Sequence, residues 1–339
     1  MNTFYIFPSL TRISDLAEKP FQEDKIDRSK WATGDYVVCK ILDPGSNTLL
    51  LELPNGRMRG IIGGELIVGV LGERFATLEA TGTWKEVGAD GIMSVLTSAG
   101  LLGKLTSKST FIPNMMQVAY QGHVSRNGEK ITMNHFLPEI EPMPFTTPVV
   151  LFVGTSMSAG KTTSARIVAN IFKSAGYKVV GAKLSGAGRY KDILAIKDVG
   201  ADAIFDFVDV GLPSSICPPD IYKEKLTLLL RLIAHEKADV AIIEVGASPL
   251  EPYNGDIAIA ALGDNIKCTI LSASDPYAVY GLMNAFSMVP DIVTGITTNT
   301  LAGAAMVEQL CEVRALNLID SKTTSALKEI LSLKTGYKL

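Results

Sequence analysis

Residues 149–163 read Val-Val-Leu-Phe-Val-Gly-Thr-Ser-Met-Ser-Ala-Gly-Lys-Thr-Thr, and this stretch decides the fold. The run 149–153 is continuously apolar, which is typical of a strand buried on both faces of a parallel sheet. Apolar residues then recur at helical spacing over 161–174, so a helix is predicted there. Because Gly154 and Gly160 stand between the strand and the helix, the stretch predicts a phosphate-binding loop.

The chemistry of this loop suits the tail of a nucleoside triphosphate. Glycines let the backbone wrap a polyphosphate, and the start of the helix directs unpaired amides and its positive dipole end at the same anion. Lys161 is placed to reach the β- and γ-phosphates, and the Thr162 hydroxyl is placed to bind Mg²⁺. The predicted nucleotide-binding residues of the loop are Gly154, Thr155, Ser156, Ser158, Ala159, Gly160, Lys161, Thr162 and Thr163.

Strands and helices alternate after the loop. Apolar runs predict strands at 178–184, 239–245, 268–272 and 292–298, and helical patterns cover 220–236, 277–286 and 303–313. This alternation is typical of a parallel sheet with helices on both faces, which binds ligands at the carboxyl ends of its strands. The predicted fold class is α/β: a P-loop NTPase with a mostly parallel sheet and flanking helices over 149–339, preceded by a smaller β-rich domain.

The segment before the loop has a β pattern. Short apolar runs at 35–42, 48–53, 57–62, 117–124 and 130–136 are separated by turn sequences such as Pro54-Asn55-Gly56 and Asn127-Gly128. They predict a small barrel or sandwich, while 100–113 shows no clean period and stays unassigned. His123 and His135 flank the second turn; a pair of metal ligands is conceivable, but structural histidines are favoured.

A proline-rich stretch marks the domain boundary. Residues 137–148 read LPEIEPMPFTTP, and proline disfavours helix at its own position and at the preceding residue. We therefore expect a β-rich domain of unknown role at 1–137, an extended linker at 138–148 and a nucleotide-binding domain at 149–339.

Composition excludes several classes of protein. The chain of 339 residues has 32 Lys and Arg against 35 Asp and Glu, a balance that argues against nucleic acid as a partner. A hydrophobic fraction of 47% excludes global disorder, and no run of about 20 apolar residues predicts a membrane span. The start MNTFYIFPSL has no basic region or cleavage site of a signal peptide. Four widely spaced cysteines are expected to be reduced thiols, so a cytoplasmic location is predicted.

The loop pattern GTxxxxGKT, one residue longer than usual, resembles that of dethiobiotin synthetase and its relatives. The resemblance continues over roughly 149–313. Gly181-Ala182-Lys183 closes the second strand, where that family has a lysine that meets the substrate amine and carboxylate. Lys191-Asp192-Ile193 is similar to the segment that bears a magnesium-binding aspartate, and Ile243-Glu244-Val245 to the strand end that bears the second acidic magnesium ligand. Gly295–Asn299 corresponds to a strand end whose asparagine recognises adenine.

This resemblance implies ATP and Mg²⁺ as cofactors, Lys161 and Lys183 as catalytic residues, and Thr162, Asp192 and Glu244 as the metal site. It also implies a homodimer. A metal-binding role for Glu244 is also indicated without the resemblance, because a carboxylate at the end of an apolar strand is costly to bury without a cation. The plainer alternatives are an ion pair for Lys183, a helix cap or surface charge for Asp192, and a turn residue for Asn299. Residues 244–252 are less glycine-rich than in the family, so the family's substrate is not carried over.

The leading functional hypothesis is an ATP- and Mg²⁺-dependent ligase or kinase that phosphorylates a small carboxylate or carbamate for ligation or cyclisation. One alternative is a nucleotide-dependent switch or partner-binding ATPase. Thr155 and Ser156 are uncharged where partition-type ATPases carry an additional lysine, which weighs against the switch. Another alternative is an acyltransferase whose loop binds the diphosphate of coenzyme A.

Overall fold

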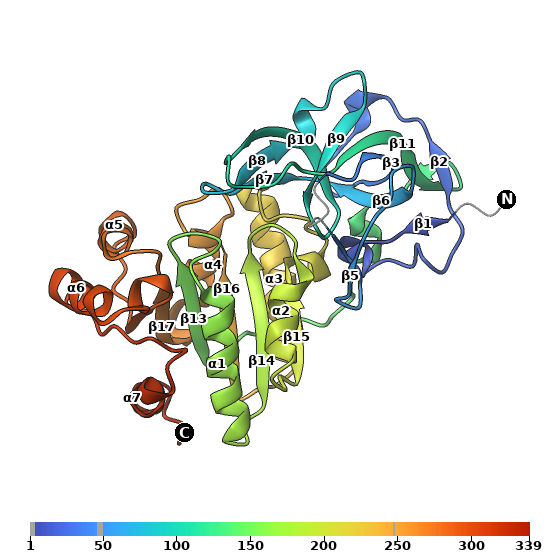
Figure 1. Cartoon of the computed structure of the whole chain (residues 1–339). Helices are drawn as coiled ribbons and strands as arrows, with labels where there is room; N and C mark the ends of the chain where they lie inside the picture. Colours follow the sequence, from blue (N-terminus) through green and yellow to red (C-terminus); the bar gives the residue numbers. More distant parts are fainter. Residues whose placement is uncertain (1–3, 46–49, 247) are drawn as a thin grey trace. The chain divides into compact units, whose positions relative to one another are not determined.

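The computed structural model describes residues 4–45, 50–246 and 248–339, which form two compact units (Figure 1). The first unit contains Met1–Glu139 together with Ala187–Lys191 and Phe207–Ile216. The second contains Ile140–Gly186, Asp192–Asp206 and Cys217–Leu339. The expectation that 149–339 belongs wholly to one domain is therefore wrong for two short segments.

Close packing explains why these two segments belong to the first unit. A β-bridge joins Ala187 to Ser214, and the Gly188 amide donates to the Pro213 carbonyl at 3.0 Å. Gly188 also lies so near Leu10 that a Cβ on it would be 2.5 Å from the leucine Cδ2. Only a glycine allows this approach.

The first unit is built around a closed ring of five strands. β3 (Tyr36–Asp43) pairs with β6 (Leu66–Leu71) and β11 (Gln117–Arg126), β11 pairs with β9 (Ile92–Thr97), and β9 pairs with β10 (Leu101–Lys108). Because β10 pairs back with β6, the ring closes, so of the predicted barrel or sandwich this unit has the barrel. The other strands are β1 (Tyr5–Ile6), β2 (Gln22–Asp24), β4 (Leu51–Glu52), β5 (Met58–Arg59), β7 (Glu73–Phe75), β8 (Ala80–Thr83) and β12 (Glu129–Lys130).

The structure differs from the sequence analysis in parts of this unit, and the strand predicted at 57–62 is reduced to β5. The strand expected over 130–136 stops at Lys130, and Met133–Phe136 forms a 3₁₀ helix, because Thr132 and His135 cap its start reciprocally. The unassigned stretch 100–113 contains β10, one of the ring strands. The predicted strand at 48–53 begins outside the described residues, and the structure shows only β4 within it.

The second unit is a six-stranded parallel sheet with the order β15-β14-β16-β13-β17-β18. Its strands are β13 (Val149–Gly154), β14 (Val179–Ser185), β15 (Ala203–Asp206), β16 (Val240–Val245), β17 (Ile266–Ser272) and β18 (Ile292–Thr294). Its helices are α1 (Lys161–Ser174), α2 (Tyr190–Lys197), α3 (Pro219–His235), α4 (Gly255–Leu262), α5 (Pro276–Phe286), α6 (Leu301–Cys311) and α7 (Thr324–Thr335), with the first two residues of α2 counted in the other unit. The α/β fold with a parallel sheet is thus as predicted.

Burial follows the apolar pattern of the strands. All residues of β13, β14 and β16 are buried, as expected for central strands covered on both faces. α1 contributes Val168 and Phe172 to the core beside Phe152 of β13. The strand predicted over 292–298 is shorter than expected, because Gly295 turns the chain at φ 92° and a 3₁₀ helix follows at Ile296–Thr298.

Since every pairing in this sheet is parallel, the carboxyl ends of its strands lie at one edge. In register, Lys183 of β14 lies opposite Asp206 of β15 on one side and Glu244 of β16 on the other. Glu244 in turn lies opposite Phe152, two residues before the glycine that opens the loop. No helix in 4–45, 50–246 and 248–339 combines the length and the apolar character needed to cross a bilayer.

Candidate functional site

The loop after β13 encloses its own lysine. Lys161 is 2% exposed, and its ammonium donates to the Ser156 carbonyl at 2.6 Å. Its side chain runs along Gly154, where an added Cβ would lie 2.7 Å from Nζ and 2.8 Å from Cδ. Gly160, with φ at 106°, turns the chain into the helix. The lysine thus lies inside the curve of the loop rather than in bulk water.

A hydroxyl–carboxylate pair lies next to the loop. Thr162 Oγ1 donates to Glu244 Oε2 at 2.9 Å, and Glu244 is 4% exposed. Thr162 is the second residue of α1, and Glu244 is the penultimate residue of β16, the strand beside β13. Burial lowers the pKa of Lys161, and the negative charge of Glu244 opposes that shift.

These observations decide the fold family. The second unit has the fold of a P-loop NTPase. A buried strand leads into a glycine-bounded loop, a lysine and threonine open the following helix, and an acidic residue ends the neighbouring strand. This is a nucleotide-binding fold.

A second lysine lies among three carboxylates at the same edge of the sheet. Lys183 Nζ donates to Asp192 Oδ2 at 2.6 Å, and the lysine side chain is 9% exposed. Burial by itself would lower the pKa of Lys183, but Asp192, Glu244 and Asp206 together raise it above the ordinary value. The three carboxylates therefore stabilise the charged form of Lys183.

The acidic residues of this site fit magnesium held together with phosphate. Within the described residues no three His, Cys, Asp or Glu side chains come together as a metal cage. Magnesium at phosphate sites takes one or two carboxylates and completes its shell with phosphate oxygens and water. Glu244 and the adjacent Thr162 hydroxyl offer one carboxylate and one hydroxyl ligand for such a magnesium ion. Asp192 is different, because one of its oxygens already accepts from Lys183.

The remaining predicted residues lie around the loop. Ser158 and Thr163 are exposed, while Ala159 is buried. Gly295 packs against the loop so closely that a Cβ on it would be 2.3 Å from the Ala159 carbonyl oxygen. Asn299 follows four positions later, exposed at the end of the 3₁₀ helix. The strand end that carries Asn299 thus borders the loop, although the described contacts give the asparagine side chain no partner in the loop.

Sequence reasoning missed Asp206 and the residues that brace the loop. Asp206 is 1% exposed at the end of β15 and acts on Lys183 through its charge. The signal was present, because Asp206 ends an apolar run in the same way as Glu244. The Thr155 amide donates to the Ser272 carbonyl at 3.1 Å, and the Thr155 hydroxyl accepts from the Ser274 amide at 3.2 Å. These bonds tie the loop to the end of β17.

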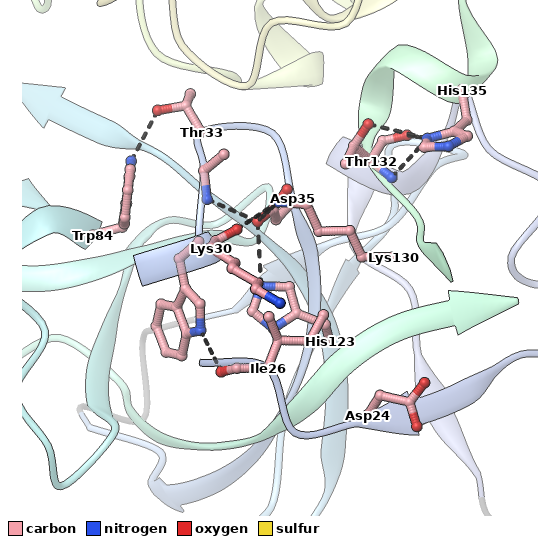
Figure 2. A network of polar contacts seen from close by, with 12 residues as sticks. Asp24, Ile26, Lys30, Thr33, Asp35, Trp84, His123, Lys130, Thr132 and His135 are labelled. Atoms are coloured by element: carbon pink, nitrogen blue, oxygen red, sulfur yellow. Dashed lines mark hydrogen bonds and ion pairs between the residues drawn. The ribbon is translucent and has the colours of Figure 1, made fainter. Parts of the chain in front are cut away.

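The two histidines near the second turn have structural contacts (Figure 2). His123 is fully buried, with Nδ1 2.7 Å from the Tyr120 hydroxyl and Nε2 3.2 Å from Asp35 Oδ2. His135 takes part in the cap at Thr132. Both ring nitrogens of His123 are engaged by protein groups, so the favoured structural interpretation is confirmed for this residue.

Comparisons with known proteins find only distant structural similarity. No family model matches the chain, and no curated protein matches it. Among solved structures, HypB from Helicobacter pylori in complex with nickel is 19% identical, with a TM-score of 0.38 over 57% of this chain and 90% of that chain. Chloroplast FtsY from Physcomitrella patens is 16% identical, with a TM-score of 0.37 over 52% of this chain, which spans 59% of that protein's length.

A DUF1611 family protein from Anabaena variabilis is 12% identical, with a TM-score of 0.38 over 61% of this chain and 65% of that chain. None of these three is a dethiobiotin synthetase.

Proposed function

We propose that this chain binds a nucleoside triphosphate with Mg²⁺, hydrolyses its terminal phosphate and uses the cycle as a nucleotide-dependent switch. The observation that carries the proposal is the 2.9 Å contact between Thr162 and Glu244 directly beside a loop that encloses Lys161. Hydrolysis of a phosphate chain requires positioning and charge neutralisation more than covalent chemistry by the protein, and these residues provide both.

Each residue has a distinct part in this proposal. The loop amides and the Lys161 ammonium bind the β- and γ-phosphates, which requires the lysine to exchange the Ser156 carbonyl for phosphate oxygens. The Thr162 hydroxyl and the Glu244 carboxylate hold the metal, which supplies further neutralisation of the phosphate charge when it is bound. Asn299 is proposed to meet the base, which makes ATP the first nucleotide to test.

The state of Lys183 favours a switch over a ligase. In the resemblance to dethiobiotin synthetase, this lysine meets an acceptor substrate. Here it is bound to Asp192 at 2.6 Å and flanked in register by Glu244 and Asp206. An anionic acceptor would have to displace Asp192 from this ion pair with the buried Lys183.

A small-molecule ligase or kinase remains the second candidate, and one observation supports it. Lys183 is a buried cation beside the proposed metal carboxylate, a position that suits stabilisation of a carboxylate acceptor if Asp192 turns away.

Phosphate release by the purified full chain separates the two candidates. We expect Mg²⁺-dependent turnover of ATP or GTP without any added acceptor, and we expect Lys161→Ala to abolish both turnover and nucleotide binding. Turnover that appears only with a small-molecule extract would favour the ligase or kinase. Absence of nucleotide binding by the unmodified chain would refute both.

We also propose that the chain pairs with a second copy through α5 and α6. The two helices expose large apolar side chains: Tyr277, Tyr280, Leu301, Met306 and Leu310. α5 contains no charged residue, and α6 contains only Glu308. Such a face suits a symmetric contact, in which a charge near the axis would meet its own copy. Light scattering should give the mass of a dimer for the unmodified chain and of a monomer for Tyr280→Lys, and a monomeric unmodified chain would refute the pairing.

A further inference from the structure

A continuous groove runs along one face of α3 in the second unit. Its larger part, of about 520 Å³, lies between α3 and α4, and a smaller part of about 380 Å³ lies between α3 and residues 142–145. Thr227 and Leu230 line both parts, so the two form one groove, here called the α3 groove. Five residues of α3 line it at the spacing of a single helix face: Lys223, Leu226, Thr227, Leu230 and Arg231.

The walls of the α3 groove are held in place within the second unit. α3 and α4 pack against each other, and both contact β14 (Figure 1). On the other side of α3, the His235 ring donates to the Glu141 carbonyl at 2.9 Å, and the Asn265 side chain donates to the Phe145 carbonyl at 3.2 Å. These two bonds hold both ends of the 141–145 segment. Because the walls are in place before anything binds, docking requires little ordering of this chain.

The floor of the groove is apolar and only partly covered. Leu226 is buried. The other large apolar residues of the lining are half-buried: Met143, Phe145, Leu230 and Ile257. An apolar partner would remove the exposed parts of these side chains from water, which is favourable.

Two cations of α3 border this apolar floor and lack an ion pair among the described residues. The cations that form ion pairs in the described part of the second unit are Lys173, Lys178, Lys183, Arg314 and Lys334. Lys223 and Arg231, which line the groove, are not among them. The α4 wall carries the opposite charge, at the exposed Asp256. An occupant with carboxylates on the side of α3 therefore complements the charges of the groove.

The length and the walls of the groove favour a helix as its occupant. Lys223 and Arg231 lie eight positions apart on α3, which is about 12 Å along the helix axis. An extended peptide would bring unpaired backbone N–H and C=O groups to walls formed by two helices and the 142–145 segment, none of which is a strand with a free edge. A helix satisfies its own backbone groups and presents only side chains to the groove.

We propose that the α3 groove docks an amphipathic helix of a partner protein. The apolar stripe of that helix covers the floor of the groove, and carboxylates about two turns apart on one flank meet Lys223 and Arg231. Asp256 meets a basic residue on the opposite flank, so the two flanks fix how the bound helix is turned about its axis. The inference goes beyond the proposed function and depends on neither nucleotide binding nor turnover.

Selection from a displayed peptide library against the full chain tests this docking. The library holds helical peptides of about 18 residues, or about five turns, with a fixed leucine stripe and with flanking positions randomised among Glu, Gln and Lys. We expect enrichment of Glu along one flank, at positions seven or eight residues apart, and of Lys along the other flank. Absence of any enriched peptide, or enrichment without a Glu pair at that spacing, would overturn the proposal.

Thr227→Glu blocks the groove with little risk to the fold, because Thr227 is exposed. Its carboxylate lies four positions from both Lys223 and Arg231 and supplies the charge that the partner would bring. The affinity for the selected peptide should fall at least about tenfold in fluorescence polarisation. The matched control is Ser325→Glu, which adds the same charge at an exposed position of α7 outside the groove and should leave the affinity unchanged. Equal affinity of Thr227→Glu and the unmodified chain would overturn the proposal.

Charge reversal tests the pairing by gain as well as by loss of binding. The double variant Lys223→Glu, Arg231→Glu should bind the selected peptide at least about tenfold more weakly and should regain affinity for a peptide whose Glu residues are replaced by Lys. Weaker binding of both peptides by the folded double variant would overturn the proposed pairing.

A second copy of this chain in the groove would show in light scattering. Thr227→Glu should leave the mass of the full chain in solution unchanged, because the groove is assigned to a different protein. A fall in mass to that of a monomer would overturn the docking of a partner helix.

Discussion

Replacing Gly154 with alanine should disable the loop without disturbing the fold. Gly154 is not among the residues with positive φ, so its backbone accepts alanine without strain. The obstacle is Lys161, because the new Cβ would lie 2.7 Å from Nζ, 2.8 Å from Cδ and 3.0 Å from Cγ. Comfortable contacts between such atoms are about 3.5–4.0 Å, so the lysine must retreat by roughly 1 Å.

That displacement sets the expected magnitude. Lys161 would leave the position from which it now reaches the Ser156 carbonyl at 2.6 Å. A misplacement of about 1 Å costs up to roughly 100-fold in a positioned interaction, which corresponds to about 2.7 kcal/mol. We expect the affinity for Mg²⁺–ATP to fall by about this factor in a titration with a fluorescent nucleotide analogue, while the thermal unfolding temperature changes little.

The matched control is Gly281→Ala in α5 of the same unit. A Cβ at Gly281 meets nothing within 4 Å, and its φ is not positive. Alanine there should leave the affinity unchanged and stabilise the helix by up to about 1 kcal/mol. Gly154→Ala protein that binds nucleotide as tightly as the unmodified chain would refute the assigned position of Lys161.

Three further predictions follow from the buried charges and thiols. Glu244→Gln should lower Mg²⁺ affinity in the nucleotide complex by at least about 10- to 100-fold and leave metal-free nucleotide binding intact; an unchanged Mg²⁺ titration would make Glu244 purely structural. Lys183→Met should lower the free energy of unfolding in urea by about 3–5 kcal/mol, because Asp192 loses its buried partner. Burial lowers the pKa of Lys183, but the Asp192, Glu244 and Asp206 carboxylates raise it above 10.5. The stability that Lys183 contributes is therefore present at neutral pH and is lost only as the pH rises beyond that value. Equal stability of the Lys183→Met variant and the unmodified chain at pH 7 would contradict this. Burial raises the pKa of Cys268 to about 12 and of Cys217 to about 11, so the native protein should react slowly with Ellman's reagent at pH 8 and show four thiols once unfolded; fast labelling of the native protein would contradict this.

The phosphate loop could be predicted from the sequence because all its parts are contiguous in the chain. The strand, the loop glycines, the lysine and the helix follow one another within 149–174, so local spacing alone places Lys161 and Thr162 in the loop. The same holds for α1, whose observed bounds match the predicted helix. Strand ends are less readable where a local cap or turn competes, as at Thr132 and Gly295.

Contacts between distant parts of the chain needed the tertiary structure. The closing of the barrel depends on the pairing of β10 with β6, and β10 lies in a stretch with no readable period. Likewise, Lys183 is surrounded by carboxylates because β14 lies between β15 and β16, an order that no local pattern states.

The sequence by itself determined the chemistry of the loop and the class of the second unit. Only the tertiary structure decided that Lys183 is paired with Asp192 and that Glu52, 138 positions from Tyr190, caps the start of α2. The physical reason is that spacing along the chain fixes which residues share a strand or a helix face. Packing of whole elements decides which buried charges find partners.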